Sequence, residues 1–190
     1  MAYVTIFELK NYLDISVEDD DIILTACIDR AEAAIETYTN RDFEASTATK
    51  YYGWDAVDGL YLWLDDDLYS LTSIANGDSD STAIATANVT LWPRNQGPPY
   101  TKIRLNDGAN TVWQIDTDYW ITIIGTWGYS STPSNDVKQA ALRWAAYMYR
   151  QIDTGDFETV ALAEAGIIAV QQGVPQDVRV LLDPHRRFSL

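Results

Sequence analysis

The sequence contains one cysteine and one histidine, and their scarcity excludes several kinds of site. Because Cys27 is the only cysteine, no disulfide can form within the chain. A structural zinc site takes four cysteine or histidine ligands, which one residue of each cannot supply. His185 lies next to the C-terminus, where chain ends are often poorly held, so a rigidly oriented imidazole for a Ser-His-Asp triad is not expected.

Long apolar runs, phosphate-binding loops and an excess of basic residues are missing as well. No run of about 18 apolar residues occurs, so no transmembrane helix is predicted, and the N-terminus lacks the pattern of a secretory signal. Neither GxxxxGKS/T nor GxGxxG is present. With 13 Lys and Arg against 28 Asp and Glu, the net charge is −15. Tight DNA binding is therefore not expected, because it requires neutralisation of phosphates.

Aromatic residues that carry a polar atom are abundant. The chain has 190 residues, of which 47% are apolar, and this predicts a single domain with a hydrophobic core. It has 12 Tyr and 7 Trp but only 4 Phe. Tyr and Trp tolerate half-exposed positions and are enriched at protein interfaces. Packing in the core is the default explanation, while a carbohydrate-binding platform would use the same side chains.

Two helices are predicted near the N-terminus. Thr5-Ile6-Phe7-Glu8 fits a capping box and begins a helix over about 6–13. The four carboxylates at 18–21 suit the positive end of a second helix over about 20–38 better than they suit a metal site. Apolar residues recur along this helix at helical spacing, and Cys27 lies beside them as a small buried residue. Asn40 suits the left-handed position that ends it.

Further helices are predicted towards the C-terminus. Thr132-Pro133 opens a helix that ends near 152, with the proline at the first helical position. Residues 153–174 are weakly patterned, although 159–169 could be helical. A last short helix begins at Pro175 and is stopped by Asp183-Pro184.

The segment between these helices has the composition of β-strands. Turn residues separate runs rich in β-branched and aromatic residues, and their spacing indicates an antiparallel meander. Both faces of the run LYLWL are apolar, which predicts a strand covered on both sides, either by helices or by neighbouring subunits. The predicted strands are 47–54, 60–64, 70–75, 88–92, 101–105 and 119–128.

Two acidic stretches in this segment have alternative explanations. Asp65-Asp66-Asp67 could supply the paired carboxylates of a glycosidase, but a solvated turn at the strand end is the preferred explanation. Residues 76–80 alternate oxygen ligands as calcium loops do, yet they lack the later glutamate, and this favours a polar hairpin tip. We therefore expect no enzyme, and no catalytic, metal or cofactor-binding residues.

Six segments, taken in order, carry a resemblance to a known family. They are TIFELKNYL (5–13), DIILTACIDRAEAAIETYTNRDF (21–43), LWLDDDLYSLTSI (62–74), PPYTKIRL (98–105), GTWGYSSTPSNDVKQAALRWAAYMYR (125–150) and GVPQDVRVLLDPHRR (173–187). Together they resemble the head–tail connector, or head-completion adaptor, family of long-tailed double-stranded DNA phages. The resemblance covers nearly the whole chain and is specific through the order of the segments.

The resemblance implies an α+β fold, made of a small helical bundle with a large inserted antiparallel β element and an extended C-terminal arm. The helical frame would comprise 1–43 and 133–152, the β insertion 47–128 and the arm 153–190. Such proteins form a ring, usually twelvefold, below the portal protein, and they dock the next connector or tail-terminator protein. DNA would pass through the lumen without specific binding. The protein would then belong to the head–tail interface of a virion, with assembly in the host cytoplasm.

Two sets of contact residues follow from this reading. The basic arm suits an acidic groove on the portal, although a merely solvated tail is the alternative. Ring formation would bury aromatic surface between subunits, although the same tryptophans could equally belong to the core. The portal-contact candidates are Arg179, Leu182, His185, Arg186, Arg187 and Phe188, and the subunit-interface candidates are Trp54, Trp63 and Trp120. A carbohydrate-binding β module remains the alternative function.

Overall fold

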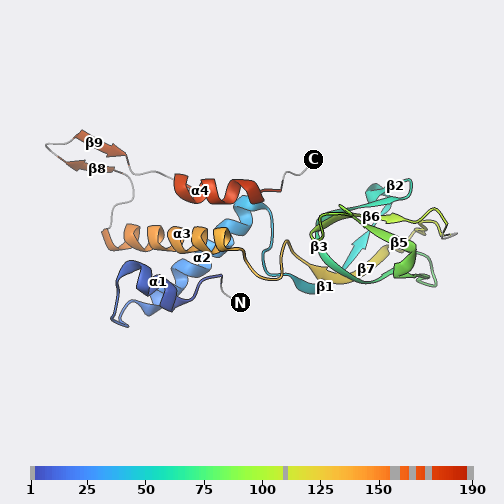
Figure 1. The fold of residues 1–190 in the computed structure, drawn as a ribbon, viewed down its shortest axis with the longest axis horizontal. Coiled ribbons are helices and arrows are strands. Elements are labelled where there is room, and N and C mark those ends of the chain that lie inside the picture. Colours follow the sequence, from blue (N-terminus) through green and yellow to red (C-terminus); the bar gives the residue numbers. More distant parts are fainter. Residues whose placement is uncertain (1–2, 109–110, 155–158, 163–165, 170–172, 188–190) are drawn as a thin grey trace. The chain divides into compact units, whose positions relative to one another are not determined.

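The chain forms two compact units in a computed structural model, which describes residues 3–108, 111–154, 159–162, 166–169 and 173–187. The helical unit combines residues 1–40 with 133–190, and the sheet unit comprises residues 41–132. Figure 1 shows helices in the first unit and a curved antiparallel sheet in the second. The predicted α+β class is confirmed.

Local hydrogen bonds set the limits of the first two helices, α1 (Ile6–Leu13) and α2 (Asp21–Thr39). Thr5 Oγ1 accepts the Glu8 amide at 3.2 Å, and the Thr5 amide donates to the Glu8 carboxylate at 2.7 Å, as the predicted capping box requires. The hydrogen bonds that the Thr5 amide and hydroxyl donate to the Glu8 carboxylate lower its pKa. Asn40 ends α2 with φ 52° and ψ 44°, in the predicted left-handed conformation.

The core of the helical unit lies between α2, α3 (Asn135–Thr154) and α4 (Gln176–Leu182). The described members of this core include Leu24, Ile28, Ile35, Val137, Trp144 and Val178. The alanines of α3 at 140, 145 and 146 are buried and permit close helix approach. Cys27 of α2 is buried as well, and this burial raises the pKa of its thiol. The cysteine therefore packs as a small apolar residue.

Three details of the C-terminal half differ from the sequence predictions. Helix α3 begins at Asn135, two residues after Pro133, because the Ser134 carbonyl accepts the Lys138 amide at 2.9 Å. The sequence left open a helix over 159–169, and that interpretation is wrong: β8 (Thr159–Leu162) and β9 (Gly166–Ala169) pair as antiparallel strands. Their β-branched residues favour that conformation. Within the predicted arm, α4 is not extended but packs against α3 (Figure 1).

The sheet unit contains strands arranged in the order β1-β7-β3-β6-β5, with the short β2 and β4 also paired to β3. The strand pairings are antiparallel, as predicted, and an isolated parallel bridge joins Gly77 to Ile115 outside the strands. The predicted meander is wrong, because the first strand pairs with the last one rather than with its neighbour in the sequence. The strands are β1 (Ser46–Tyr52), β2 (Val57–Asp58), β3 (Tyr61–Ala75), β4 (Ala83–Ile84), β5 (Val89–Trp92), β6 (Tyr100–Leu105) and β7 (Ile121–Trp127).

Strand β3 organises this sheet. It was predicted as two strands joined by a solvated turn, which is wrong, because it continues through the three aspartates with a register shift between Trp63 and Leu68. Its first half pairs with β6 and its second half with β7. A bulge of this kind bends a strand and increases its twist. One strand can therefore serve two partners while Leu62, Leu68 and Ile74 enter the same core.

The end of β7 packs tightly against its neighbours. Trp127 is buried, and its indole N–H donates to the Ala48 carbonyl at 3.1 Å. Gly125 lies against the neighbouring strand, where an added Cβ would sit 2.5 Å from the Ser70 carbonyl oxygen. Gly128 has φ +144° and leaves no room for a side chain against Ala45. Both glycines are therefore required by close backbone approach.

Replacing Gly125 with alanine is expected to lower the free energy of unfolding by about 1–3 kcal/mol, because the added methyl group forces β3 and β7 apart. Urea unfolding monitored by tryptophan fluorescence measures the change. Gly108→Ala is the matched control, since nothing lies within 4 Å of its added Cβ. Equal effects of the two substitutions would contradict the proposed crowding at Gly125.

Candidate interaction surfaces

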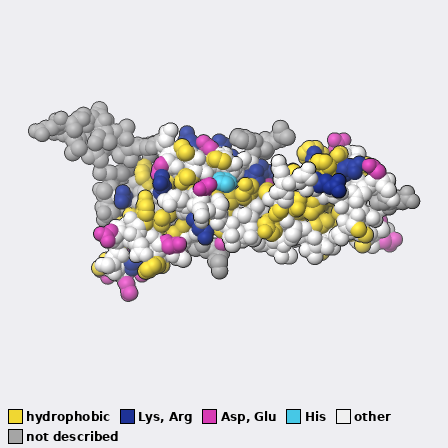
Figure 2. Space-filling view, in the orientation of Figure 1, with side chains coloured by type: hydrophobic (Ala, Val, Ile, Leu, Met, Phe, Trp, Pro, Cys, Tyr) yellow, Lys and Arg dark blue, Asp and Glu magenta, His cyan; other side chains and the backbone are white. Residues whose placement is uncertain are grey.

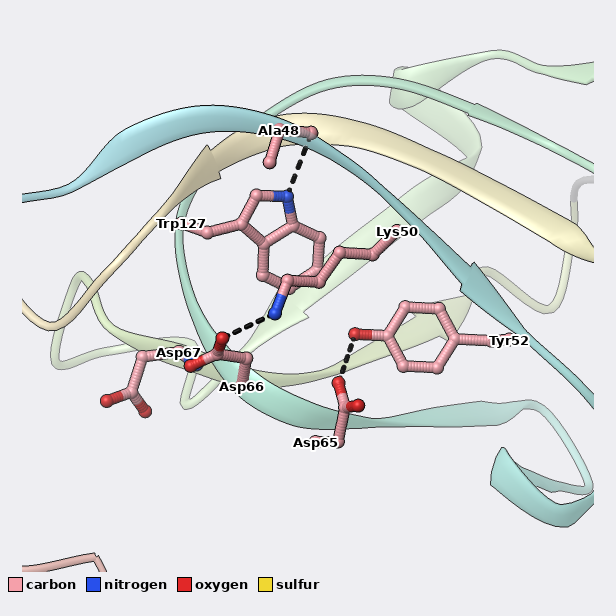
Figure 3. A network of polar contacts seen from close by, with 7 residues as sticks. All are labelled: Ala48, Lys50, Tyr52, Asp65, Asp66, Asp67 and Trp127. Carbon is pink, nitrogen blue, oxygen red and sulfur yellow. Dashed lines mark hydrogen bonds and ion pairs between the residues drawn. The ribbon is translucent and has the colours of Figure 1, made fainter. Parts of the chain in front are cut away.

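The three consecutive aspartates of β3 each contact a different donor, and Figure 3 shows the contacts of Asp65 and Asp66. The Tyr52 hydroxyl donates to Asp65 at 2.7 Å, and the Lys50 ammonium pairs with Asp66. The Arg41 guanidinium pairs with Asp67 at 2.6 Å. Tyr52 and Lys50 belong to β1, so these contacts join β1 to β3 across the sheet. The aspartates hold the bulge together, which neither a solvated turn nor a glycosidase pair describes.

Aromatic rings complete this network. The Lys50 ammonium lies 4.8 Å from the centre of the Trp127 ring, and the Arg41 guanidinium lies 4.5 Å from that of Tyr129. Tyr129 also makes an edge contact with Phe43 at 5.4 Å between ring centres. Trp127 and Tyr129 therefore pack the part of the sheet unit where the chain enters β1 and leaves β7.

The polar stretch after β3 forms a hairpin tip, as predicted. The Asn76 amide donates to the Thr82 carbonyl at 2.9 Å, and the Thr82 amide donates to the Asp78 carboxylate at 2.6 Å. Hydrogen bonds from Thr82 lower the pKa of Asp78. Within the described residues no group of three or more His, Cys, Asp or Glu is placed to hold a metal ion.

All three tryptophans proposed for subunit contacts are exposed, but the structure brings only two of them together. Trp54 is 57% exposed and Trp120 is 56% exposed. They line one hollow, in which the Trp120 ring packs over Gly53 and the Trp54 indole donates to the Ile115 carbonyl at 3.2 Å. We call it the acidic aromatic hollow, and it is lined by Gly53, Trp54, Asp55, Ile115, Asp116, Thr117, Tyr119 and Trp120.

The third tryptophan, Trp63, belongs to a separate surface. The strand register places Trp63 opposite Lys102, and Lys102 opposite Trp92, so one cation lies between two indoles across three strands. The Lys102 ammonium lies 4.5 Å from the Trp63 ring centre and 5.8 Å from that of Trp92. Trp63 is 44% exposed, so this side of its strand is not fully covered within the described part of the chain, and its coverage by a neighbouring subunit stays a prediction.

The next cross-strand row extends this surface. Tyr61 lies opposite Arg104, and the Tyr61 ring centre is 5.0 Å from the Lys102 ammonium. Arg104 also bonds both oxygens of Asp107, and this contact raises the pKa of its guanidinium. Figure 2 shows Lys and Arg side chains gathered beside hydrophobic side chains on the sheet unit. We call this surface the basic aromatic face; it consists of Tyr61, Trp63, Trp92, Lys102 and Arg104.

The predicted portal-contact residues fall into different environments. Arg179 and Arg186 are exposed, whereas His185 and Arg187 are half-buried. Leu182 is fully buried in the helical core, so its side chain is not available for an outside contact in this structure. Phe188 lies outside the described residues.

The segment after α4 is tied to the end of α2. The Tyr38 hydroxyl donates to Asp183 at 2.5 Å, and burial together with this bond raises the pKa of the phenol. The Arg186 guanidinium lies 4.8 Å from the Tyr38 ring centre, and the Arg187 amide donates to the Thr39 carbonyl at 2.8 Å. Contacts with Tyr38 and Thr39 therefore fix the position of the segment that carries Arg186 and Arg187.

Sequence reasoning missed two surface features. Phe7 is 71% exposed and Ile22 is 85% exposed in the helical unit. A signal for Ile22 existed, because it lies off the apolar stripe of its helix. Lys102 was also missed, and the alternation of Lys102 and Arg104 along one strand was the available signal.

No described helix is long and apolar enough to cross a membrane.

These observations define a mixed α+β protein in which an antiparallel sheet unit is inserted into a helical unit made from both ends of the chain. Residues 2–188 match the head completion protein family. The chain therefore belongs to the head completion protein family. No curated protein matches it.

Solved structures of phage-like particles share the fold. A chain in "Neck of empty GTA particle computed with C6 symmetry" is 19% identical with a TM-score of 0.65, and the match covers 99% of this chain and 91% of that one. A chain in the neck of a native particle with C12 symmetry is 21% identical with a TM-score of 0.61, covering 97% and 89%. A chain of the native gene transfer agent virion is 21% identical with a TM-score of 0.61, and the match covers 99% of this chain and 91% of that one.

Proposed function

We propose that this protein is a structural component of the neck that joins the head of a phage or phage-like particle to its tail. The observation that carries this proposal is the family match, which spans nearly the whole chain. The shared fold supports it, since chains of the same fold occur in the necks of gene transfer agent particles. The exposed aromatic and charged surfaces are available for docking to other neck proteins.

In this proposal the chain forms a ring, twelvefold in number, below the portal protein, and the ring continues the DNA channel to the next connector or tail-terminator protein. The symmetry of the similar neck assemblies supports a ring. The net charge of −15 suits a channel through which DNA passes without being held. The role is structural and involves no catalysis.

The exposed arginines of the C-terminal segment are the proposed portal contacts. Arg179 and Val180 of α4 are exposed, Val180 by 66%, and Arg186 is exposed after the helix, so this segment presents both charge and apolar surface. Arg187 lies in the same segment, which is held by Tyr38 and Thr39. A partner with an acidic groove would complement these charges. Leu182 is left out of the proposed contact because it belongs to the core.

Removal of the gene for this chain from a particle-producing strain is expected to yield DNA-filled heads without attached tails, whereas free tails continue to form. Electron microscopy of the particles and a transduction or infection assay measure the result. Supplying the wild-type chain in trans should restore joined particles. Complementation by a variant with Arg179 and Arg186 replaced by glutamate should be strongly reduced, while Lys138→Glu, a single charge reversal elsewhere, should complement. Normal tailed particles without the chain would overturn the proposed function.

A carbohydrate-binding module is the second candidate function, and the acidic aromatic hollow is the observation that favours it. Exposed tryptophan and tyrosine rings beside carboxylates are used to stack and hydrogen-bond sugar rings. A glycan array probed with the purified chain tests this function. Saturable binding that is lost in Trp54→Ala and Trp120→Ala, together with normal particles lacking the chain, would favour it over the neck role.

A further inference from the structure

The sheet unit carries two exposed aromatic surfaces of opposite charge, and they share no residue. The basic aromatic face presents Lys102 between indole rings on the outer side of β3, β6 and β5. The acidic aromatic hollow is built by the turn after β1 and by the residues leading into β7. Both surfaces present Trp and Tyr side chains, which are enriched at protein interfaces.

Each surface lacks the charge that the other provides. Among the described residues, Lys102 has no carboxylate partner, since its contacts are the rings of Tyr61, Trp63 and Trp92. Asp55 and Asp116 are exposed, and neither has an ion-pair partner in the described part of the chain. Arg104 is already bound to Asp107. Lys102 is therefore the cation on this face that is available for a carboxylate.

We infer that the basic aromatic face of one copy docks into the acidic aromatic hollow of the next copy. Lys102 then pairs with Asp55 or Asp116, and Trp63 packs against the indoles of Trp54 and Trp120. Two different patches meet in such a contact, so each bound copy leaves one patch of each kind open for a further copy. A repeated head-to-tail contact closes into a ring when its rotation divides the full turn. This inference rests on the proposed function and names the surfaces that build the proposed ring.

The same geometry explains why the tryptophans are exposed in a single chain. Trp54, Trp63 and Trp120 are each between 44% and 57% exposed. Isolated exposed aromatics need no explanation, but those gathered on two patches with complementary charge fit a contact that forms on assembly. The opposite charges orient the subunits, while the rings supply the apolar area that leaves water.

Carbodiimide crosslinking tests the contact directly, because this reagent joins a carboxylate to a primary amine with no spacer. A mixture of isotopically heavy and light copies of the full chain is treated, and linked peptides are identified by mass spectrometry. We expect peptides that join light Lys102 to heavy Asp55 or Asp116. The ion pair between Lys10 and Asp21, at 2.7 Å within one chain, is the internal positive control. Lys102→Arg keeps the charge but lacks the amine, so it should assemble normally and lose the crosslink.

Charge reversal gives an independent test by light scattering and native mass spectrometry. Lys102→Glu should weaken association of the chain by about tenfold or more, as should Asp55→Lys combined with Asp116→Lys. An equal mixture of the two variants should recover assembly, because each then meets a complementary charge on the other. Lys138→Glu makes the same change in net charge as Lys102→Glu and should leave association unchanged.

The possible results separate this contact from the function on which it rests. Rings that form without the mixed-isotope crosslink, or reversed variants that assemble as the wild type does, overturn the contact and leave the neck role standing. Absence of the crosslink at the highest concentration that the chain tolerates also overturns the contact. If reversal in the hollow blocks binding of another neck protein instead of self-association, the occupant is that protein and the proposal is wrong. Tailed particles made without the chain overturn the neck role itself.

Discussion

Replacement of Asp67 with asparagine is expected to lower the free energy of unfolding by about 3–5 kcal/mol, the usual cost of breaking a buried ion pair on one side. Asp67 is 1% exposed, and its carboxylate is paired with the Arg41 guanidinium at 2.6 Å. Arg41 is itself only 16% exposed. The substitution keeps the shape of the side chain and removes its charge, so the guanidinium is left without a counter-ion in a poorly solvated place. Urea unfolding followed by circular dichroism measures the loss.

The neighbouring Asp66 provides the matched control, because it is the same residue type on the same bulge. Its partner Lys50 is 27% exposed and Asp66 is 41% exposed, so water screens this pair. Asp66→Asn is expected to cost about 0–1 kcal/mol. A double-mutant cycle with Arg41→Ala should show that the effects of Asp67→Asn and Arg41→Ala are not additive. If the two asparagine variants lower the free energy of unfolding equally, burial does not set the strength of these ion pairs.

Truncation of Leu182 to alanine is expected to cost about 2–5 kcal/mol, because the side chain is fully buried and its removal leaves a cavity. Leu182 lies in the last turn of α4, a helix of 7 residues that depends on packing for its stability. We therefore expect α4 to lose protection from hydrogen exchange before the rest of the helical unit does. Thermal unfolding and hydrogen exchange monitored by mass spectrometry measure these two effects.

Val180→Ala is the control for this helix, since Val180 is 66% exposed on the other side of α4. Its effect on stability is expected to stay within about 0.5 kcal/mol. The pair also distinguishes a core residue from a portal contact. If Leu182→Ala leaves stability unchanged and abolishes binding to neck proteins, Leu182 is a contact residue and its assignment to the core is wrong.

The helices could be predicted from the sequence because the interactions that begin and end them are local. The capping box from Thr5 to Glu8 lies within one turn of the helix start, and Asn40 ends α2 through its own backbone conformation. The apolar stripe of α2 recurs within one helix. The sequence predicted that α3 begins at Pro133, but the helix begins two residues later, at Asn135, after Ser134. A helix was considered for residues 159–169, which form strands, since a weak pattern does not distinguish helix from strand.

The sheet could be recognised as antiparallel, but its order could not be derived. Strand β1 pairs with β7, and Ser46 lies opposite Trp127. Pairing between strands so far apart in the sequence depends on which strand edges meet when the core forms. The spacing of strands along the chain does not predict this order. The bulge at Asp65–Asp67 was unpredictable for the same reason. Its charges are stabilised by Lys50 and Arg41, which lie far from it in the sequence.

The sequence by itself determined the class of fold, the positions of the helices and the family resemblance, because these depend on local periodicity and on the order of short segments. Only the tertiary structure decided which residues are accessible. It placed Leu182 in the core, left Trp54, Trp63 and Trp120 exposed, and set Lys102 between two indoles. Accessibility depends on which strands and helices cover a side chain. That covering comes from contacts between residues distant in the sequence, and a pattern along the chain does not encode them.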